Sequence, residues 1–120
     1  MTTIRLPLPP SANVYWKVWR GHMHVSEEAR AYKQQARWYC LSNGIEPLVG
    51  EVKLSVDVYM VNKRRDLDNT LKVLGDSLNG IAYHDDNQVV EIHARRFQVP
   101  KAKRGQKREG YVIVTIEEAA

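Results

Sequence analysis

The chain of 120 residues has a mass of 13.8 kDa, 43% hydrophobic residues and a formal net charge of +4. A chain of this length can bury one core but excludes a separate substrate domain, so we expect a single domain over residues 1–120. Its one cysteine, Cys40, excludes an intrachain disulfide, which fits a reducing compartment. No apolar run is long enough to span a bilayer and no signal-peptide pattern opens the chain, so we expect a cytoplasmic protein without a membrane partner.

The first 25 residues predict strands. Residues Thr2–Leu8 alternate between apolar and polar side chains, and the prolines that follow would end this strand. Tyr15–Val25 has the pattern of a hairpin with its turn at Arg20 and Gly21.

A helix is predicted from Ser26 to about Ser42. Ser26 is a favourable N-cap, and the two glutamates after it place negative charge where the helix dipole favours it. Gly44 would end the helix after Asn43. We expect Trp38 in the core, because tryptophan is more often buried than used to stack on bases. The remaining buried face is predicted to consist of Ala29, Tyr32, Ala36, Tyr39 and Cys40.

The clearest strand is Val52–Met60, where apolar and polar residues alternate over nine positions. Further strands are predicted at Val90–Val99 and Tyr111–Ile116. The intervening residues Lys101–Gly110 would form a long exposed loop. Together these elements predict an α+β fold with a mixed sheet of four or five strands and two main helices.

A second helix is predicted in the middle of the chain, ended by Gly80. Its apolar face consists of Leu67, Leu71, Leu74 and Leu78. A polar row would lie about 100° away on the same helix, because each residue turns the helix by roughly that angle. This row consists of Asp68, Lys72 and Asp76.

Acidic residues lie on both sides of this helix. Asp66 precedes it where the chain leaves a strand, and Asp85 and Asp86 follow it where the chain returns to the sheet. Clustered carboxylates repel one another unless a cation or solvent relieves the repulsion. Carboxylate oxygens without a cysteine or a histidine pair suit Mg²⁺ or Mn²⁺ better than zinc. We therefore consider a divalent metal site at which the two groups of acids meet.

Each of these acids also has a structural explanation. Asp66 could cap the helix, and Asp68 could form an exposed ion pair with Lys72 that contributes a few tenths of a kcal/mol. Asp85 and Asp86 could simply lie in a solvent-facing turn. The chain could then be a non-catalytic nucleic-acid binding module, whose binding would weaken with salt.

Basic residues flank the acidic stretch. One group lies just before the central helix and would hold a phosphodiester beside the acidic pocket. Another lies in the loop between the last two strands and is a candidate nucleic-acid arm. A solvated loop tip is the alternative for the second group. The candidate DNA-binding residues are Lys63, Arg64, Arg65, Lys101, Lys103, Arg104, Lys107 and Arg108.

Four motifs follow one another along the chain, namely L-P-L-P-P-S-A-N, R-R-D-L-D-N-T-L-K, D-S-L-N-G and H-D-D-N-Q-V-V. In this order they resemble the RusA family of Holliday-junction resolvases. The resemblance covers nearly the full length, and its specific part is D-x-D-N-x-x-K followed by D-D.

The resemblance implies a Mg²⁺-dependent, homodimeric endodeoxyribonuclease of a family common in prophages, which resolves four-way DNA junctions by paired nicks. It implies that Asp66, Asp68 and Asp86 are catalytic metal ligands, that Asp85 is a further acidic ligand, and that Lys72 assists catalysis. Mn²⁺ would substitute for Mg²⁺, and no organic cofactor is expected. A nuclease of the same chemistry with another branched substrate is the alternative within this class.

Overall fold

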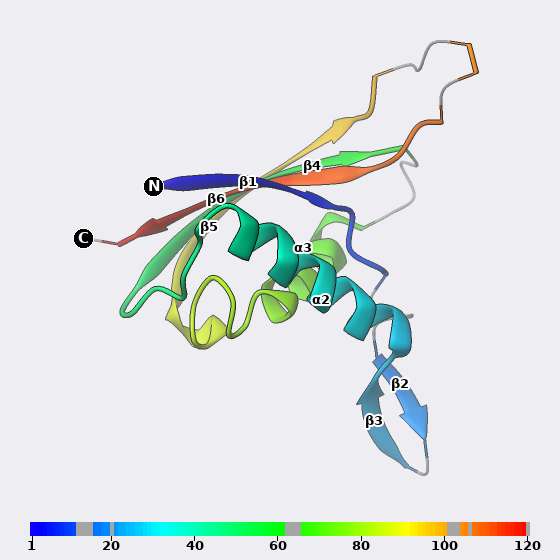
Figure 1. Ribbon diagram of the computed structural model, residues 1–120. Helices are drawn as coiled ribbons and strands as arrows, with labels where there is room; N and C mark the ends of the chain where they lie inside the picture. The colour runs from blue at the N-terminus through cyan, green and yellow to red at the C-terminus, as the bar shows by residue number, and fades with distance from the viewer. Residues whose placement is uncertain (12–15, 20, 62–65, 101–103, 106, 120) are drawn as a thin grey trace.

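A computed structural model describes residues 1–11, 16–19, 21–61, 66–100, 104–105 and 107–119 and has an α+β fold (Figure 1). The main sheet consists of β1 (Thr2–Pro7), β4 (Val52–Met60), β5 (Val89–Gln98) and β6 (Tyr111–Glu118). Its strand order is β1-β6-β4-β5. The neighbours β4 and β5 are parallel, whereas β6 is antiparallel to both β1 and β4. The predicted fold class, with a mixed sheet and two main helices, is confirmed.

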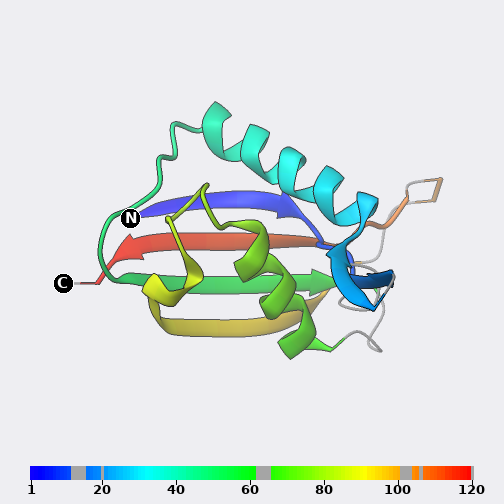
Figure 2. The ribbon, with the colours of Figure 1, turned by 90° about the horizontal axis from the view of Figure 1, so that it is seen from below.

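Two helices, α2 (Glu27–Ser42) and α3 (Leu67–Ser77), lie on the same face of this sheet. Figure 2 shows α2 on the β1 side and α3 over β4 and β5. The strands β2 (Trp16–Trp19) and β3 (His22–Val25) form a separate antiparallel hairpin that projects from the body of the molecule, as predicted (Figure 1). Among the described residues, no helix is long and apolar enough to cross a membrane.

The helix α2 begins and ends where the sequence predicts. The Ser26 hydroxyl accepts a hydrogen bond from the N–H of Ala29 at 3.2 Å, and Asn43 forms the C-cap. The predicted face is buried except for Tyr39, which is half-buried. The prediction for Trp38 is wrong, since its side chain is 64% exposed. Trp38 lies about 200° around the helix from the buried Ala36, which turns its ring toward solvent.

Period two in β4 separates the two faces of the sheet. The even positions from Val52 to Met60 are all buried beneath the helices, where each fully buried aliphatic side chain stabilises the fold by about 1.5–3 kcal/mol. The same face of β6 contributes its own alternate residues to the core, namely Val112, Val114 and Ile116.

Three stacked aromatic rings cross the opposite face of the sheet. Tyr59 on β4 stacks on Tyr111 of β6 with ring centroids 4.5 Å apart, and on Phe97 of β5 at 5.0 Å. A guanidinium lies at each end, with Arg5 at 3.8 Å from the Tyr111 ring and Arg95 at 5.2 Å from the Phe97 ring. Aromatic pairs of this kind stabilise by roughly 0.5–1.5 kcal/mol each, so the row supports the pairing of β6, β4 and β5 at one end of the sheet.

The connection between β4 and β5 positions the candidate chemistry. Because parallel neighbours cannot be joined by a tight turn, the chain must cross over the sheet between them. This crossover contains α3, residues 78–85 and the 3₁₀ helix η1 (Asp86–Gln88). All the predicted acidic site residues therefore lie in one crossover above β4 and β5.

Candidate active site

Asp66 caps the helix α3. Its Oδ1 accepts a hydrogen bond from the N–H of Asp68 at 3.0 Å, and its carbonyl accepts one from the hydroxyl of Thr70 at 3.0 Å. Both bonds fix the point at which the chain enters the helix, so that Asp68 and Lys72 follow on the first two turns. The capping alternative for Asp66 is confirmed.

Asp85 caps the 3₁₀ helix η1 in the same way. Its Oδ1 accepts a hydrogen bond from the N–H of Asn87 at 3.0 Å. This hydrogen bond, helped by one from the Asp86 carboxyl, holds the pKa of Asp85 below its usual value. Asp85 and Asp86 are both exposed, so the predicted solvent-facing turn is also confirmed.

The pKa of Asp86 is raised by its neighbours. Hydrogen bonding to the Asp85 carboxyl raises the pKa of Asp86, and desolvation and the negative charges of Asp85 and Asp76 raise it further. A raised pKa means that ionisation is opposed by neighbouring carboxylates. A bound cation would remove this opposition, so the electrostatics of the turn favour a positively charged ligand.

A hollow of about 460 Å³ lies between α3 and the strands β4 and β5. Asp68, Lys72 and Asp86 contribute its charged side chains, and Tyr83 lines it as well. The structure therefore brings together the two acids from opposite ends of the crossover and the lysine that the helical spacing placed beside Asp68. The apolar wall of the hollow consists of Leu54, Val56, Leu71, Leu74, Val89, Ile92 and Ala94.

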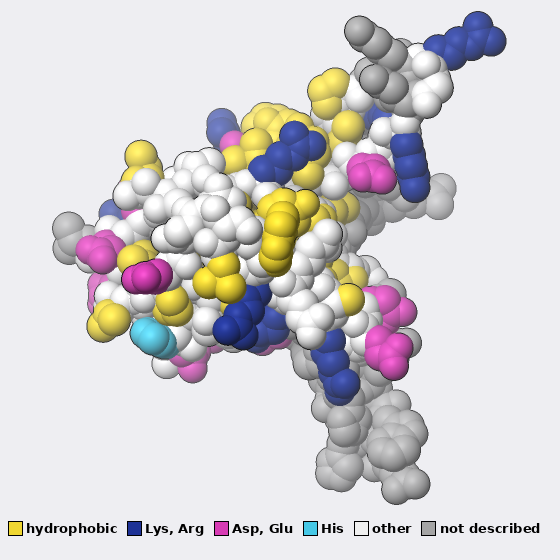
Figure 3. Space-filling view, in the orientation of Figure 1, with side chains coloured by type: hydrophobic (Ala, Val, Ile, Leu, Met, Phe, Trp, Pro, Cys, Tyr) yellow, Lys and Arg dark blue, Asp and Glu magenta, His cyan; other side chains and the backbone are white. Residues whose placement is uncertain are grey.

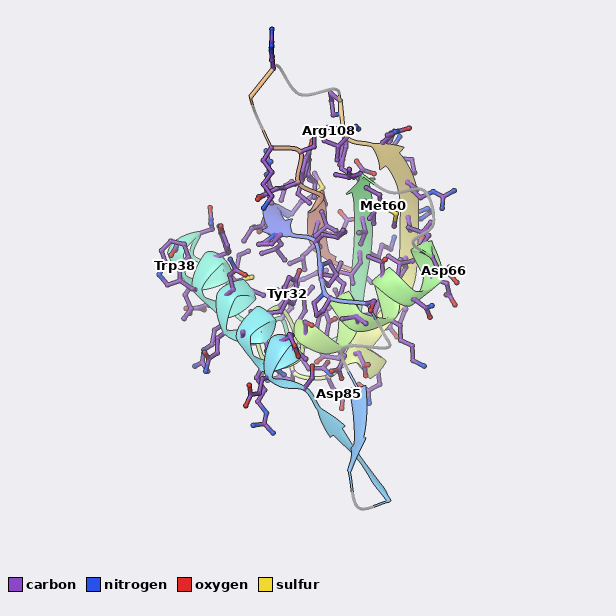
Figure 4. The ribbon with its side chains drawn as sticks, turned by 90° about the vertical axis from the view of Figure 1, so that its right-hand side faces the viewer. Tyr32, Trp38, Met60, Asp66, Asp85 and Arg108 are labelled. Carbon is purple, nitrogen blue, oxygen red and sulfur yellow. The ribbon has the colours of Figure 1, made fainter. Side chains whose placement is uncertain are left out.

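The other two predicted ligands lie elsewhere. Figure 4 shows Asp66 at the start of α3 and Asp85 toward the opposite end of this helix, and neither residue lines the hollow. Within the described part of the chain, no group of three or more His, Cys, Asp or Glu side chains is arranged to hold a metal ion. Two of the four predicted ligands, Asp68 and Asp86, thus share one hollow, and the metal site itself stays a prediction.

The chemistry of the donors in the hollow fits a hard cation. Asp68 and Asp86 offer carboxylate oxygens, and the described residues that line the hollow include no cysteine or histidine. Oxygen donors of this kind suit Mg²⁺ or Mn²⁺ and not a metal that requires thiolate or imidazole ligands.

Tyr83 is a residue of the site that the sequence analysis missed. It is buried, and its hydroxyl donates a hydrogen bond of 2.6 Å to the carbonyl of Gly75 near the end of α3. Burial, with the nearby charges of Asp86, Asp76 and Asp85, raises the pKa of Tyr83, so the phenol stays neutral and keeps its proton for this bond. Tyr83 therefore fastens the helix to the segment that leads into the acidic turn.

The predicted DNA-binding residues Lys63, Arg64, Arg65, Lys101 and Lys103 lie outside the described residues. Arg104 and Lys107 are exposed, and Figure 3 shows basic side chains at the outer end of the connection between β5 and β6. Arg108 is half-buried and donates a hydrogen bond of 2.7 Å to the carbonyl of Val99, which closes the base of this connection (Figure 4). Contact of any of these residues with DNA stays a prediction.

The chain is similar to a family of endodeoxyribonucleases. A family model described as endodeoxyribonuclease RusA matches residues 7–117. The crossover junction endodeoxyribonuclease RusA of Escherichia coli K12 is 35% identical over 105 residues, which cover 85% of this chain and 88% of the relative. The protein of the same name in Shigella sonnei is 34% identical over the same shares. In Enterobacteria phage 82, a crossover junction endodeoxyribonuclease is 35% identical over 84% of this chain and 87% of the relative.

These similarities define an endodeoxyribonuclease with an α+β fold. The match of the family model extends over nearly the whole chain, and the relatives align over most of their own length. The chain belongs to the RusA family, which confirms the resemblance seen in the order of its motifs.

Proposed function

We propose that this protein is a Mg²⁺-dependent endonuclease that resolves four-way DNA junctions by paired nicks as a homodimer. The observation that carries the proposal is the hollow in which Asp68, Lys72 and Asp86 come together from distant parts of one crossover. The relatives support the choice of substrate, because they are named as crossover junction endodeoxyribonucleases.

Asp68 and Asp86 would hold the metal ion, because their side chains line the hollow, whereas Asp66 and Asp85 cap the helices that carry these two acids. When bound, Mg²⁺ would lower the pKa of a water molecule and stabilise negative charge on the reacting phosphate. The raised pKa of Asp86 supports this role, because a cation beside the turn would offset the neighbouring carboxyl groups that raise it.

Lys72 would act on the phosphate directly. It lies one helical turn after Asp68 and lines the same hollow. Its ammonium group would place positive charge beside the scissile phosphodiester and hold it in position for attack. One such site cuts one strand, so a two-fold dimer would place a second site on the opposing strand.

The test is cleavage of a labelled four-way junction by the wild type and by Asp68→Asn, with Mg²⁺ or with EDTA. We expect symmetric nicks from the wild type only when Mg²⁺ or Mn²⁺ is present. Asp68→Asn should bind the junction but lose cleavage, because asparagine keeps the shape of the side chain and removes its charge. Asp57→Asn is the matched control, since Asp57 pairs with Arg95 on the opposite face of the sheet.

Full cleavage by Asp68→Asn would reject the site assignment. An intact junction with wild-type protein and Mg²⁺, together with salt-sensitive binding, would favour the non-catalytic binding module instead. The capping roles of Asp66 and Asp85 are the observation that keeps this second candidate in view. Faster cleavage of flaps or linear duplex than of the junction would keep the chemistry and change the substrate.

A further inference from the structure

The side-chain amide of Gln88 joins two segments that are distant in sequence. Its Oε1 accepts hydrogen bonds from the backbone N–H groups of His84 at 2.7 Å and Asp85 at 2.9 Å. Its Nε2 donates hydrogen bonds of 2.8 Å to the carbonyls of Leu48 and Gly50. One amide therefore ties the turn before β5 to the segment before β4, across 38 to 40 residues of chain.

The four hydrogen bonds need a side chain that accepts two of them through one atom and donates the other two through another, as an amide does. A glutamine has two acceptor sites on its oxygen and two donors on its nitrogen, and here each is used once. Because a backbone N–H can only donate and a carbonyl can only accept, the partners allow one orientation of the amide and exclude the flipped one. Replacement by glutamate would set a carboxylate oxygen against two carbonyl oxygens.

These four hydrogen bonds of Gln88, called the Gln88 clamp below, hold the part of the turn that carries the acids. His84 and Asp85, whose N–H groups it holds, directly precede Asp86, which lines the hollow with Asp68 and Lys72. Asp85 and Gln88 together form a capping box, since Asp85 accepts from the backbone of η1 while Gln88 accepts from the backbone of Asp85. Gln88 thus fixes both the internal shape of the turn and its distance from the sheet.

We propose that Gln88 is a positioning residue that holds the Asp85–Asp86 turn in the place where Asp86 faces the hollow. The inference rests on the proposed function, because the purpose of the placement is to present Asp86 to a divalent cation beside Asp68. Gln88 itself does not line the hollow and takes no part in the chemistry.

The Gln88 clamp contributes more to the position of the turn than to the stability of the fold. The bonds to His84, Asp85 and Gly50 are exposed, and the bond to Leu48 is only partly buried. Water can therefore replace most of them when the amide is removed, which limits the penalty for unpaired groups. Water cannot restore the connection between the two segments, so the turn should loosen while the core stays folded.

The experiment compares the wild type with Gln88→Met, which removes all four bonds, and with Gln88→Glu, which keeps an acceptor and removes the donors. Gln35→Glu on the exposed surface of α2 is the control for the change in charge. Three quantities are measured for each protein: the Mg²⁺ concentration for half-maximal junction cleavage, junction binding in EDTA, and hydrogen exchange of the backbone amides of residues 84–88.

We expect both Gln88 variants to need about 10–100-fold more Mg²⁺ than the wild type, which is the usual effect of removing a group that orients a metal ligand. Exchange at His84 and Asp85 should be faster in Gln88→Met, while junction binding in EDTA and all properties of Gln35→Glu stay at wild-type values. Gln88→Glu should fold even if Gln88→Met does not, because it retains the bonds to His84 and Asp85.

An unchanged Mg²⁺ requirement in both variants, or unchanged exchange at His84 and Asp85 in Gln88→Met, would overturn the proposed role of Gln88. Loss of folding in both variants would overturn it as well, because Gln88 would then serve stability alone. If the wild type does not cleave the junction, the proposed function fails and this inference fails with it. If Asp68→Asn behaves as expected and the Gln88 variants match the wild type, only the inference about Gln88 is rejected.

Discussion

Replacement of Tyr83 by phenylalanine should destabilise the crossover without creating a cavity, because the substitution removes only a hydroxyl. This hydroxyl supplies the hydrogen bond to the Gly75 carbonyl. The helix does not provide a substitute donor, since the N–H of Asn79, four residues after Gly75, donates to the carbonyl of Asp76. Tyr83→Phe would therefore leave a partly buried carbonyl of the last helical turn without this partner.

The expected loss is that of one hydrogen bond in a partly buried place. Such a bond contributes about 0.5–1.5 kcal/mol to stability. The entropy of unfolding, taken as roughly 2.1 cal/mol/K per residue, is about 0.25 kcal/mol/K for a chain of 120 residues. Each kcal/mol then lowers the melting temperature by about 4 °C, so Tyr83→Phe should melt about 2–6 °C below the wild type.

The assay is thermal unfolding in EDTA, followed by circular dichroism for the wild type, Tyr83→Phe and Tyr39→Phe. Tyr39 is a suitable control because it is half-buried on α2, and its hydroxyl makes no hydrogen bond within the described part of the chain. Tyr39→Phe should melt close to the wild type. A melting temperature of Tyr83→Phe within about 1 °C of the wild type would refute the role assigned to this hydroxyl.

Two further predictions concern Gly110 and Asp86. A Cβ at Gly110 would lie 2.8 Å from Leu8 Cδ2 and 2.9 Å from the carbonyl oxygen of Tyr59, so Gly110→Ala should lower the free energy of unfolding by about 1–3 kcal/mol in urea titrations. Gly75→Ala, whose Cβ would have 3.8 Å to its nearest neighbour, should not destabilise, and equal effects of the two changes would contradict the explanation. Because the pKa of Asp86 is raised on folding, its protonated form stabilises the fold at acid pH, and this contribution is lost as pH rises through the raised value. Asp86→Asn, which stays neutral, should therefore melt above the wild type at pH 7 in EDTA and match it near pH 3; a lower melting temperature at pH 7 would show that the carboxylate is not opposed by its neighbours.

Local patterns predicted the elements that depend on local contacts. The limits of β4 follow from period two alone, and α2 follows from the Ser26 cap and the ending at Asn43. The prediction for Trp38 is wrong because the general tendency of tryptophan to be buried does not include its angle around the helix axis, which places it opposite the buried Ala36. The order of the strands in the sheet could not be predicted from local patterns, because tertiary packing decides that β6 pairs with both β1 and β4.

The candidate site could be predicted only in part for the same reason. Helical spacing placed Lys72 beside Asp68, and both line the hollow. Which of the later acids meets Asp68 depends on the path of residues 78–85, and this path brings Asp86 to the hollow and leaves Asp85 as a cap. The role of Gln88 depends on carbonyls 38 to 40 residues earlier in the chain, which no local pattern reveals, although its spacing from Asp85 matches a capping box.

The place of β6 in the sheet has a consequence for the growing polypeptide. Residues 111–118 form the strand that joins β1 to β4, so β1 has no neighbour in the sheet until they are available. A ribosome-bound fragment that stops before residue 111 would already carry every candidate catalytic side chain and still lack the strand needed to complete the sheet. Such fragments should be substrates for proteolysis and should not nick chromosomal DNA, which confines any nuclease activity to chains that have been translated through β6.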